Sequence, residues 1–357
     1  MEHVLTTGTG TRPALQTAPG EPRNPRSRTA RRWTGLIAGA VALVVATALS
    51  IAVGSRSLGL ATVWQVLWHD DGSAAAAVVH QLRLPRTALG IAVGAALGLA
   101  GTVMQALTRN PLAEPGLLGV NLGASTGVVL AIAFLGVGTA TGYVWFAIAG
   151  AGLTSAAVFA LGGSGRAPTP ERQVLAGVSL TAVLGAGVWA VLVTHREAFD
   201  RYRHWDVGSL ADREAATIVQ VTPFLVTGVV LALALGRQLN ALSMGDDSAT
   251  SLGARPARIR VLGMITITLL CGAATAASGP IWFLGLAVPY AARMVTGSDY
   301  RWILAYALVL GPALLLASDV IGRVLVAPAE LPVGVVTAFL GAPLFIALCR
   351  RRRLSVL

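Results

Sequence analysis

The sequence predicts an all-α, polytopic membrane protein, and three observations lead to this fold class. Of its 357 residues, 55% are hydrophobic and only 12% are charged, about half the charged fraction of soluble domains. The mean hydropathy is +0.70. The apolar residues form stretches close to the roughly 20 residues that a helix needs to cross a bilayer core of about 30 Å. A water-soluble globule and a disordered chain are therefore excluded.

The apolar stretches predict about ten transmembrane helices in a single domain, residues 33–350. Residues 1–32 are rich in Thr, Pro, Gly and Arg, which predicts a disordered, basic cytoplasmic tail. Residues 351–357 predict a second basic tail. The predicted spans are 33–54, 87–107, 117–137, 142–162, 173–194, 217–236, 259–278, 283–298, 302–325 and 333–349.

All 27 basic residues are arginine. A P-loop requires a lysine on the β- and γ-phosphates, so this chain cannot carry a Walker-type ATPase. With both termini inside, the predicted cytoplasmic segments hold 19 arginines and the outer loops hold 8. The positive-inside rule therefore predicts an N-in, C-in topology. The net charge of +11 is interpreted as a topology signal and not as a nucleic-acid site.

Glycines recur at helical spacing in the second apolar stretch. On a helix they leave one face without side chains, so that another backbone can approach closely. Two interpretations follow: packing inside the bundle, or a helix that lines the pore or faces a second subunit. The residues concerned are Gly90, Gly94, Gly98 and Gly101.

Asp319 lies well inside a predicted span, and Arg323 follows one turn later. An acid followed by a base at this spacing is the favourable order for an ion pair on a helix. Charged residues inside spans are also functional candidates. The pair is therefore either self-satisfied near the outer surface or part of a proton relay, for which the neighbouring cation is unfavourable.

The longest predicted cytoplasmic connection, residues 237–260, contains a short polar helix of seven residues between Gly245 and Gly253. Asp246 and Asp247 occupy its first turn, where the helix dipole favours acids. This helix either packs on another protein or is simply a capped helix on the surface of this chain. Its two aspartates lack the further carboxylates of a Mg²⁺-diphosphate site, and the five histidines have no ligand spacing. No metal or catalytic site is predicted.

These segments resemble the FecCD-type permeases, the type II ABC importers of iron-siderophores, haem or cobalamin. The resemblance extends from Trp33 to Arg350. Five motifs carry it in order: Arg83-Leu-Pro-Arg86, residues 105–120 (QALTRNPLAEPGLLGV), residues 245–253, residues 279–289 (GPIWFLGLAVP), and residues 330–337 (ELPVGVVT) followed by Gly341-Ala-Pro343.

The resemblance implies a complex in the cytoplasmic (inner) membrane of a bacterium. This chain would pair with a second permease subunit, identical or paralogous, with two cytoplasmic ABC ATPases and with an extracytoplasmic substrate-binding protein. The partner ATPases would bind ATP and Mg, while this chain would bind no cofactor and catalyse no reaction. The expected cargo is a ferric siderophore or similar iron chelate, with haem and cobalamin as alternatives.

The resemblance also implies roles for individual residues. A coupling helix on the ATPase would involve Leu242, Gly245, Asp246, Asp247, Ala249, Leu252 and Gly253. Docking of the binding protein would involve Arg83, Arg86 and Arg323. The cytoplasmic gates would involve Asn110 and Leu112 in one loop, and Thr169, Pro170 and Glu171 in another.

Four positions depart from the family pattern. Pro170 and Glu171 replace small hydroxyl residues, Tyr290 replaces a histidine, and Trp282 replaces a glycine and is expected to add bulk near the outer mouth. Outside the family, the alternative is a proton-coupled secondary transporter that acts alone through Asp319.

Overall fold

The computed structural model describes residues 25–54, 58–69, 71–162, 170–211 and 213–350. All the regular secondary structure in these ranges is helical, which confirms the all-α prediction. The elements are α1 (Pro25–Ala52), α2 (Leu60–Trp68), α3 (Ala74–Ala77), η1 (Val78–Arg83), α4 (Leu84–Thr108), η2 (Pro115–Leu118), α5 (Val120–Leu135), α6 (Ala140–Gly162), α7 (Pro170–Thr194), α8 (Arg196–Asp206), α9 (Ala215–Ser243), α10 (Asp246–Ser251), α11 (Pro256–Ser278), α12 (Leu284–Thr296), α13 (Tyr300–Leu325) and α14 (Val333–Arg350).

Each of the ten predicted apolar stretches contains a helix, but the helices differ in length. Seven are long and apolar enough to cross a membrane within the described residues. α5, α12 and α14 are shorter, with 16, 13 and 18 residues. α5 and α12 are short because the backbone before each of them leaves the α-helical conformation, at residues 109–119 and 279–283. The number of full crossings is therefore only approximately ten.

The first helix begins earlier than predicted, at Pro25 instead of residue 33. Its first turns are basic, and they contact the carboxyl end of α12. Arg31 donates a hydrogen bond to the carbonyl of Val295 at 2.8 Å, and Arg32 donates to the carbonyl of Thr296 at 2.7 Å. These carbonyls have no partner within their own helix, which explains why the basic turns are held there. The predicted tails at 1–24 and 351–357 lie outside the described residues.

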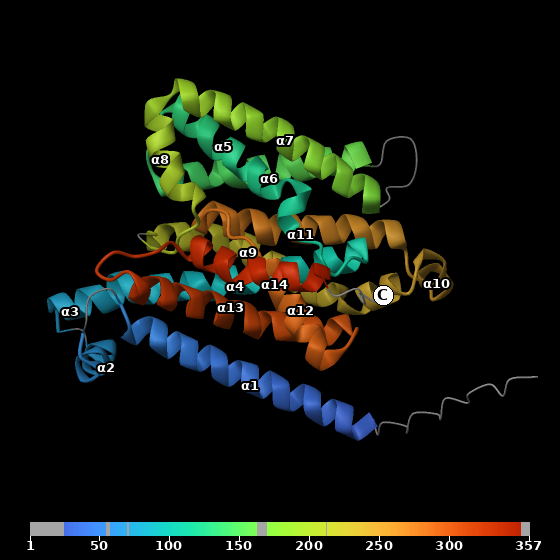
Figure 1. Ribbon diagram of the computed structural model, residues 1–357, viewed down its shortest axis with the longest axis horizontal. Coiled ribbons are helices and arrows are strands. Elements are labelled where there is room, and N and C mark those ends of the chain that lie inside the picture. The colour runs from blue at the N-terminus through green and yellow to red at the C-terminus, as the bar shows by residue number, and fades with distance from the viewer. Residues whose placement is uncertain (1–24, 55–57, 70, 163–169, 212, 351–357) are drawn as a thin grey trace, which may run out of the picture.

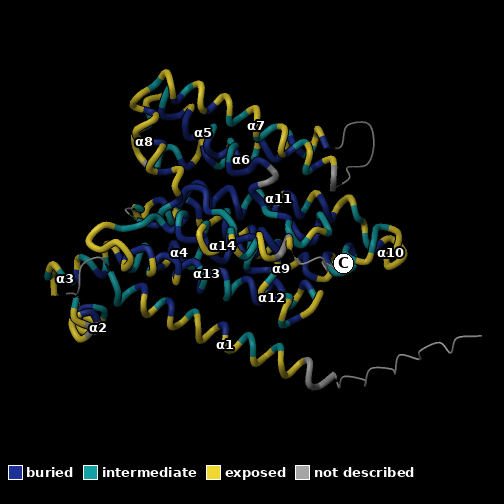
Figure 2. The backbone as a smooth tube through the Cα atoms, viewed as in Figure 1, coloured by how far each residue is buried: buried dark blue, intermediate teal, exposed yellow. Residues whose placement is uncertain are grey.

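α4 and α11 form the centre of the bundle (Figures 1 and 2). α4 packs against α9, α11, α12 and α13, whereas α5, α6 and α7 form a layer that reaches the centre through α11. α1 lies along α13 at the opposite side. The most apolar window of α4 is 78% buried, whereas those of α1 and α7 are 17% and 11% buried. The outer helices therefore present apolar surface to lipid or to another subunit.

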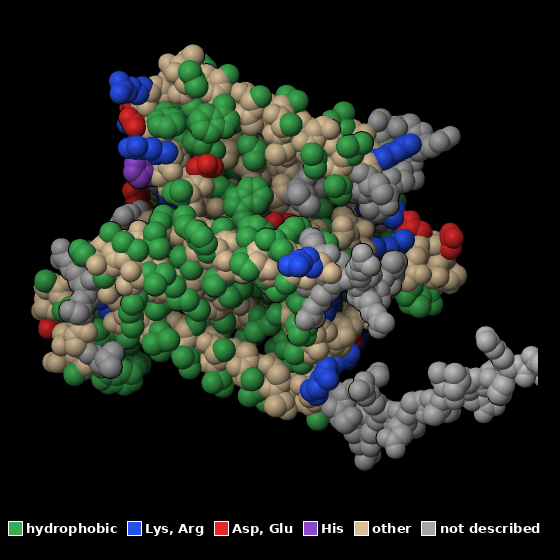
Figure 3. Space-filling view, in the orientation of Figure 1, with side chains coloured by type: hydrophobic (Ala, Val, Ile, Leu, Met, Phe, Trp, Pro, Cys, Tyr) green, Lys and Arg blue, Asp and Glu red, His purple; other side chains and the backbone are tan. Residues whose placement is uncertain are grey.

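The two ends of the bundle differ from its flank. α10 and the beginning of α1 lie at one end, and α2, α3 and α8 lie at the other (Figure 1). Most charged side chains visible in Figure 3 lie near these ends, and the flank between them is largely hydrophobic. This distribution is expected for helices that cross a bilayer, because charge is costly at its centre.

The glycine face of α4 is buried against α12 and α13. A Cβ atom placed on Gly94 would lie 2.6 Å from Cα of Pro312, and one on Gly101 would overlap the carbonyl of Gly285. All four glycines of the stripe are buried. The geometry favours close packing, and it leaves no surface on this face for a pore or a second subunit.

Gly94→Ala is expected to destabilise the protein, because its methyl group would have to push the α13 backbone away. Overpacking of this kind costs about 1–3 kcal/mol. The measurement is the thermal unfolding midpoint of the purified chain in detergent. Gly152→Ala in α6 is the control, since a Cβ there meets nothing within 4 Å. Equal stability of the two variants would refute the close approach of α4 and α13.

Candidate functional site

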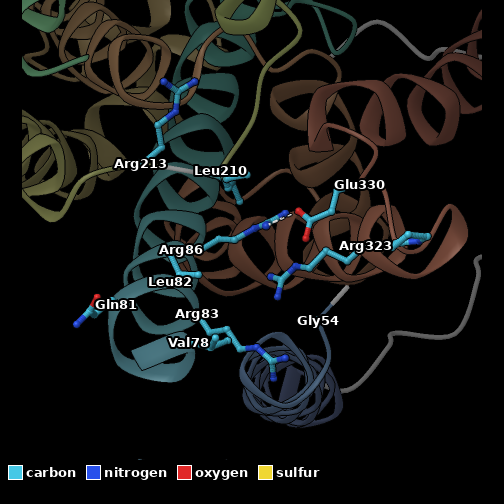
Figure 4. A pocket seen from close by; sticks show the side chains of 12 residues that line it. Gly54, Val78, Gln81, Leu82, Arg83, Arg86, Leu210, Arg213, Arg323 and Glu330 are labelled. Carbon is cyan, nitrogen blue, oxygen red and sulfur yellow. Dashed lines mark hydrogen bonds and ion pairs between the residues drawn. The ribbon is translucent and has the colours of Figure 1, made fainter. Parts of the chain in front are cut away.

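An outer charge cluster lies where α1 and α13 end and α4 begins, around a cavity of about 470 Å³ (Figure 4). We define it as Arg83, Arg86, Asp319, Arg323 and Glu330. Arg86 donates to Asp319 at 2.8 Å and to Glu330 at 2.6 Å. Nε of Arg323 donates to the second oxygen of Asp319 at 3.0 Å. Two arginines from different helices thus share one fully buried carboxylate.

Two of these arginines also hold the end of α1. Arg323 donates to the carbonyl of Ser50 at 2.8 Å, and Arg83 donates to the carbonyls of Ile51 and Ala52, each at 2.8 Å. The last carbonyls of a helix lack partners within it and carry partial negative charge, so guanidinium groups stabilise them. The cluster therefore fastens α1 to α4 and α13.

The three predicted docking arginines are brought together, but they are engaged within the protein. Arg83 is 5% exposed and Arg323 is 2% exposed, and Arg86 contacts two acids. Docking of a binding protein on them stays a prediction, and in this conformation it would require an exchange of partners. Glu330 completes the cluster, although it was not predicted as a site residue. The signal in the sequence was an imbalance of charge, since three predicted arginines had only Asp319 as an acidic partner.

The carboxylate of Asp319 is fully paired with arginines in this geometry. Both of its oxygens accept hydrogen bonds from Arg86, and one of them also accepts from Arg323. Its side chain has no solvent exposure. The structure therefore favours the ion-pair interpretation over the proton relay.

The predicted coupling segment, residues 241–253, contains α10, which has six residues instead of the predicted seven. Gly245 and Gly253 flank it with φ of +107° and +79°, a left-handed backbone that glycine adopts without a steric penalty. Leu242 and Ala249 are fully buried, so they anchor the segment and cannot contact a partner directly here. The exposed side chains include Met244, Asp247 and Leu252.

Asp246 links the coupling segment to two other parts of the chain. It forms ion pairs with Arg109, which follows α4, and with Arg260 of α11 at 2.9 Å. Burial alone would raise the pKa of Asp246, but the hydrogen bonds and charges of Arg260 and Arg109 outweigh it and lower that pKa. Asp246 therefore connects three parts of the chain, in addition to the interaction with the helix dipole that its position predicts.

Arg109 connects this segment to the first predicted gate loop. Its Nε donates to the carbonyl of Leu242 at 3.0 Å, and it has a left-handed backbone with φ of +49°. Asn110 follows, and its side chain accepts a hydrogen bond from the amide of Leu112 at 2.9 Å. Asn110 and Leu112 thus form a tight turn beside the coupling segment. The sequence did not predict this role for Arg109, because a single arginine after a membrane span indicates only which side of the membrane it lies on.

The same loop reaches the break before α12. Glu114 accepts a hydrogen bond from the backbone amide of Phe283 at 2.5 Å. Trp282 lies against Gly116, where an added Cβ would be 2.7 Å from the indole. The bulk of Trp282 is therefore placed against the loop that follows α4, and its expected position near the outer mouth stays a prediction. Glu114, the only acid in its motif, could have been identified from that isolation.

The second predicted gate is only partly described. Thr169 lies outside the described residues, and Pro170 and Glu171 begin α7. Their gating role stays a prediction.

Comparisons with known proteins agree on one family. The family model described as the FecCD transport family matches residues 42–351. The chain is 47% identical over 312 residues to the ferric enterobactin transport system permease protein FepD of Escherichia coli (strain K12), covering 87% of this chain and 93% of that protein. It is 37% identical to the hemin transport system permease protein HmuU of Yersinia pestis, covering 88% and 94%.

A solved structure has the same fold. It is an inward-facing conformation of a metal-chelate type ABC transporter, with a TM-score of 0.78 and 28% identity. The match covers 90% of this chain and 99% of that chain.

Asp319→Asn is expected to destabilise the protein by about 3–5 kcal/mol, because it leaves two arginines without their buried countercharge. Thermal unfolding of the purified chain measures this. Asp200→Asn is the control: its pair with Arg203 spans 3.5 Å between side chains that are more than half exposed, and such pairs contribute about 1 kcal/mol or less. Wild-type stability of Asp319→Asn would favour the proton relay instead.

The pair of Asp246 and Arg260 is expected to contribute about 1 kcal/mol at neutral pH in a double-mutant cycle of Asp246→Asn and Arg260→Gln. Because the pKa of Asp246 is lowered by folding, this contribution is present above the ordinary aspartate pKa of about 3.9 and is lost as the pH falls below it. Unfolding measured between pH 7 and pH 3.5 tests this. A coupling energy that does not change with pH would contradict the assignment.

Glu114→Ala is expected to cost about 1–3 kcal/mol, since the Phe283 amide would lose its partner inside the protein. Glu114→Gln keeps an acceptor oxygen and should lose less. Unfolding midpoints of both variants provide the measurement. If the alanine and glutamine variants were equally stable, the hydrogen bond to Phe283 would not contribute to stability.

Proposed function

Because the chain belongs to the FecCD transport family, we propose that it carries a ferric siderophore across the bacterial inner membrane, driven by a separate ATPase. The family consists of transport permeases, and the relatives include ABC permeases for iron chelates. The match over residues 42–351 is the observation that carries the proposal. It spans nearly all of the helical bundle.

The substrate is proposed from the relatives of the chain, because no cluster of side chains in the described residues identifies a particular ligand. The 47% identity to a ferric enterobactin permease exceeds the 37% identity to a hemin permease. A ferric siderophore is therefore proposed before haem or cobalamin. Specificity would belong chiefly to the extracytoplasmic binding protein, and this chain would pass the chelate inward with weak binding.

The coupling segment supports the proposed connection to the ATPase. Its exposed side chains, Met244, Asp247 and Leu252, form the surface that a cytoplasmic partner would contact. Closure of two ATPases would move α10 as a rigid body. The Asp246–Arg109 pair would pass this movement to the loop of Asn110 and Leu112.

The movement would continue through Glu114 to α12, which starts at the amide that Glu114 holds. Residues 110–119 and α12 would therefore shift together. At the outer end, Arg86 is the arginine best placed to exchange Glu330 for an acid on the binding protein. Such charge pairs favour steering and register more than affinity.

Uptake into liposomes tests the proposal. The permease is reconstituted with its ATPase and binding protein and is offered ferric enterobactin, a ferric hydroxamate, haem or cobalamin. ATP-dependent accumulation of a ferric siderophore is expected. Accumulation of haem or cobalamin alone would overturn the substrate, and uptake driven by a proton gradient without ATP would overturn the mechanism.

Variants of the exposed coupling surface separate docking from folding. Leu252→Asp with Asp247→Arg should weaken ATPase association by at least about tenfold, because an interface core does not tolerate a new charge. Asp200→Arg in α8 changes the same charge at the other end of the bundle and should have no effect. Unchanged ATPase association in the first variant would show that α10 is not the docking helix.

A further inference from the structure

A groove of about 510 Å³ lies between α1, α9 and α13, at the end of the bundle that carries α10. We call it the inner groove and define it by Trp33, Leu36, Leu233, Arg237, Arg301 and Trp302. The first turns of α1 and α13 and the last turns of α9 meet here. None of the outer charge cluster or the coupling helix α10 lines it.

Two arginines, one on α9 and one on α13, line this groove. Arg237 and Arg301 are exposed, and neither side chain forms a hydrogen bond or ion pair with the described residues. A Cβ atom on Gly236 would lie 3.4 Å from Cγ of Arg301, so the two helices are in van der Waals contact here. The stem of Arg301 therefore rests on α9 next to Arg237. An anion in the groove would lie on a surface that both arginines line.

The neighbouring charged groups are already engaged. Arg32 pairs with Asp299 at 3.4 Å and also donates to the carbonyl of Thr296. Asp299 further accepts a hydrogen bond from Asn240 at 2.9 Å. No described carboxylate lines the groove to neutralise Arg237 and Arg301.

The wall of the groove is aromatic and preformed. The rings of Trp33 and Trp302 meet edge to face with centroids 5.2 Å apart, and the guanidinium of Arg32 lies 5.7 Å from the centre of the Trp302 ring. Tryptophans are enriched where a membrane protein crosses the lipid headgroups. Trp33 is 53% exposed, so a ligand in the groove can reach it.

Away from the arginines the groove continues into apolar, exposed helix faces. On α9, Leu233 and Val230 follow Arg237 towards the middle of the helix, and on α1, Ile37 and Val41 follow Trp33. All four are at least 45% exposed. The surface is charged at one level and aromatic and aliphatic beyond it, which suits the phosphate and the acyl chains of a phospholipid.

We propose that the inner groove binds an anionic phospholipid of the cytoplasmic leaflet. Its phosphate lies between Arg237 and Arg301, and its acyl chains lie against Trp33, Leu36 and Leu233. Guanidinium groups bind phosphate through paired hydrogen bonds, and the cytoplasmic leaflet is the anionic one. The site depends on the N-in topology and is independent of the substrate carried.

Native mass spectrometry of the full-length chain tests this, with phosphatidylglycerol or phosphatidylcholine added at equal concentration. The wild-type chain should retain phosphatidylglycerol preferentially. Arg237→Gln with Arg301→Gln should lower that affinity by at least about tenfold. Arg196→Gln with Arg203→Gln removes the same charge at the opposite end and should bind as the wild type does. Trp33→Ala should weaken both lipids alike.

Several results would overturn the proposal. Unchanged phosphatidylglycerol binding in the Arg237 and Arg301 variant would do so, as would equal retention of the two lipids. Displacement of the lipid by glycerol phosphate would identify a simple anion site. Loss of the lipid when the chain is assembled with its second subunit would identify a protein interface. Siderophore uptake can succeed or fail independently of each of these results.

Discussion

Within a bilayer every backbone amide and carbonyl must find its partner inside the protein, and this constraint organises the charged residues of the chain. The helical bundle leaves unpaired groups where α1 and α12 end and where α12 begins. Arg83 and Arg323 bind the last carbonyls of α1, and Arg31 and Arg32 bind those of α12. Glu114 accepts a hydrogen bond from the amide of Phe283, the residue just before α12. These contacts allow an apolar bundle to contain broken helices.

The same contacts connect parts of the protein that must move together in a transporter. Asp246 joins the exposed cytoplasmic segment to α11 and to the loop after α4, and Glu114 joins that loop to α12. Both connections are polar contacts within a largely apolar molecule. Polar contacts of this kind are directional and can exchange partners, whereas the glycine contacts of α4 with α12 and α13 hold those helices in close register.

Much of the fold could be predicted from the sequence. Hydropathy located all ten apolar helices, glycine spacing on α4 indicated close packing, and Gly245 and Gly253 marked the limits of α10. The start of α1 was predicted wrongly because a tertiary contact helps to decide it. α1 starts at Pro25 and not at residue 33, and Arg31 and Arg32 of its added turns bind the end of α12.

The sequence by itself determined the family, the membrane-spanning character and the predicted topology, because hydropathy, arginine placement and motifs are properties of short stretches. Only the tertiary structure decided which partner each charge has. Arg86 meets Asp319 across 233 positions, Glu114 meets Phe283 across 169, and Arg109 meets Asp246 across 137. Such pairs depend on how helices pack, and glycine contacts that admit no side chain set that packing. For this reason the predicted docking arginines proved to be internal partners in this conformation, and Arg109 and Glu114 emerged only in three dimensions.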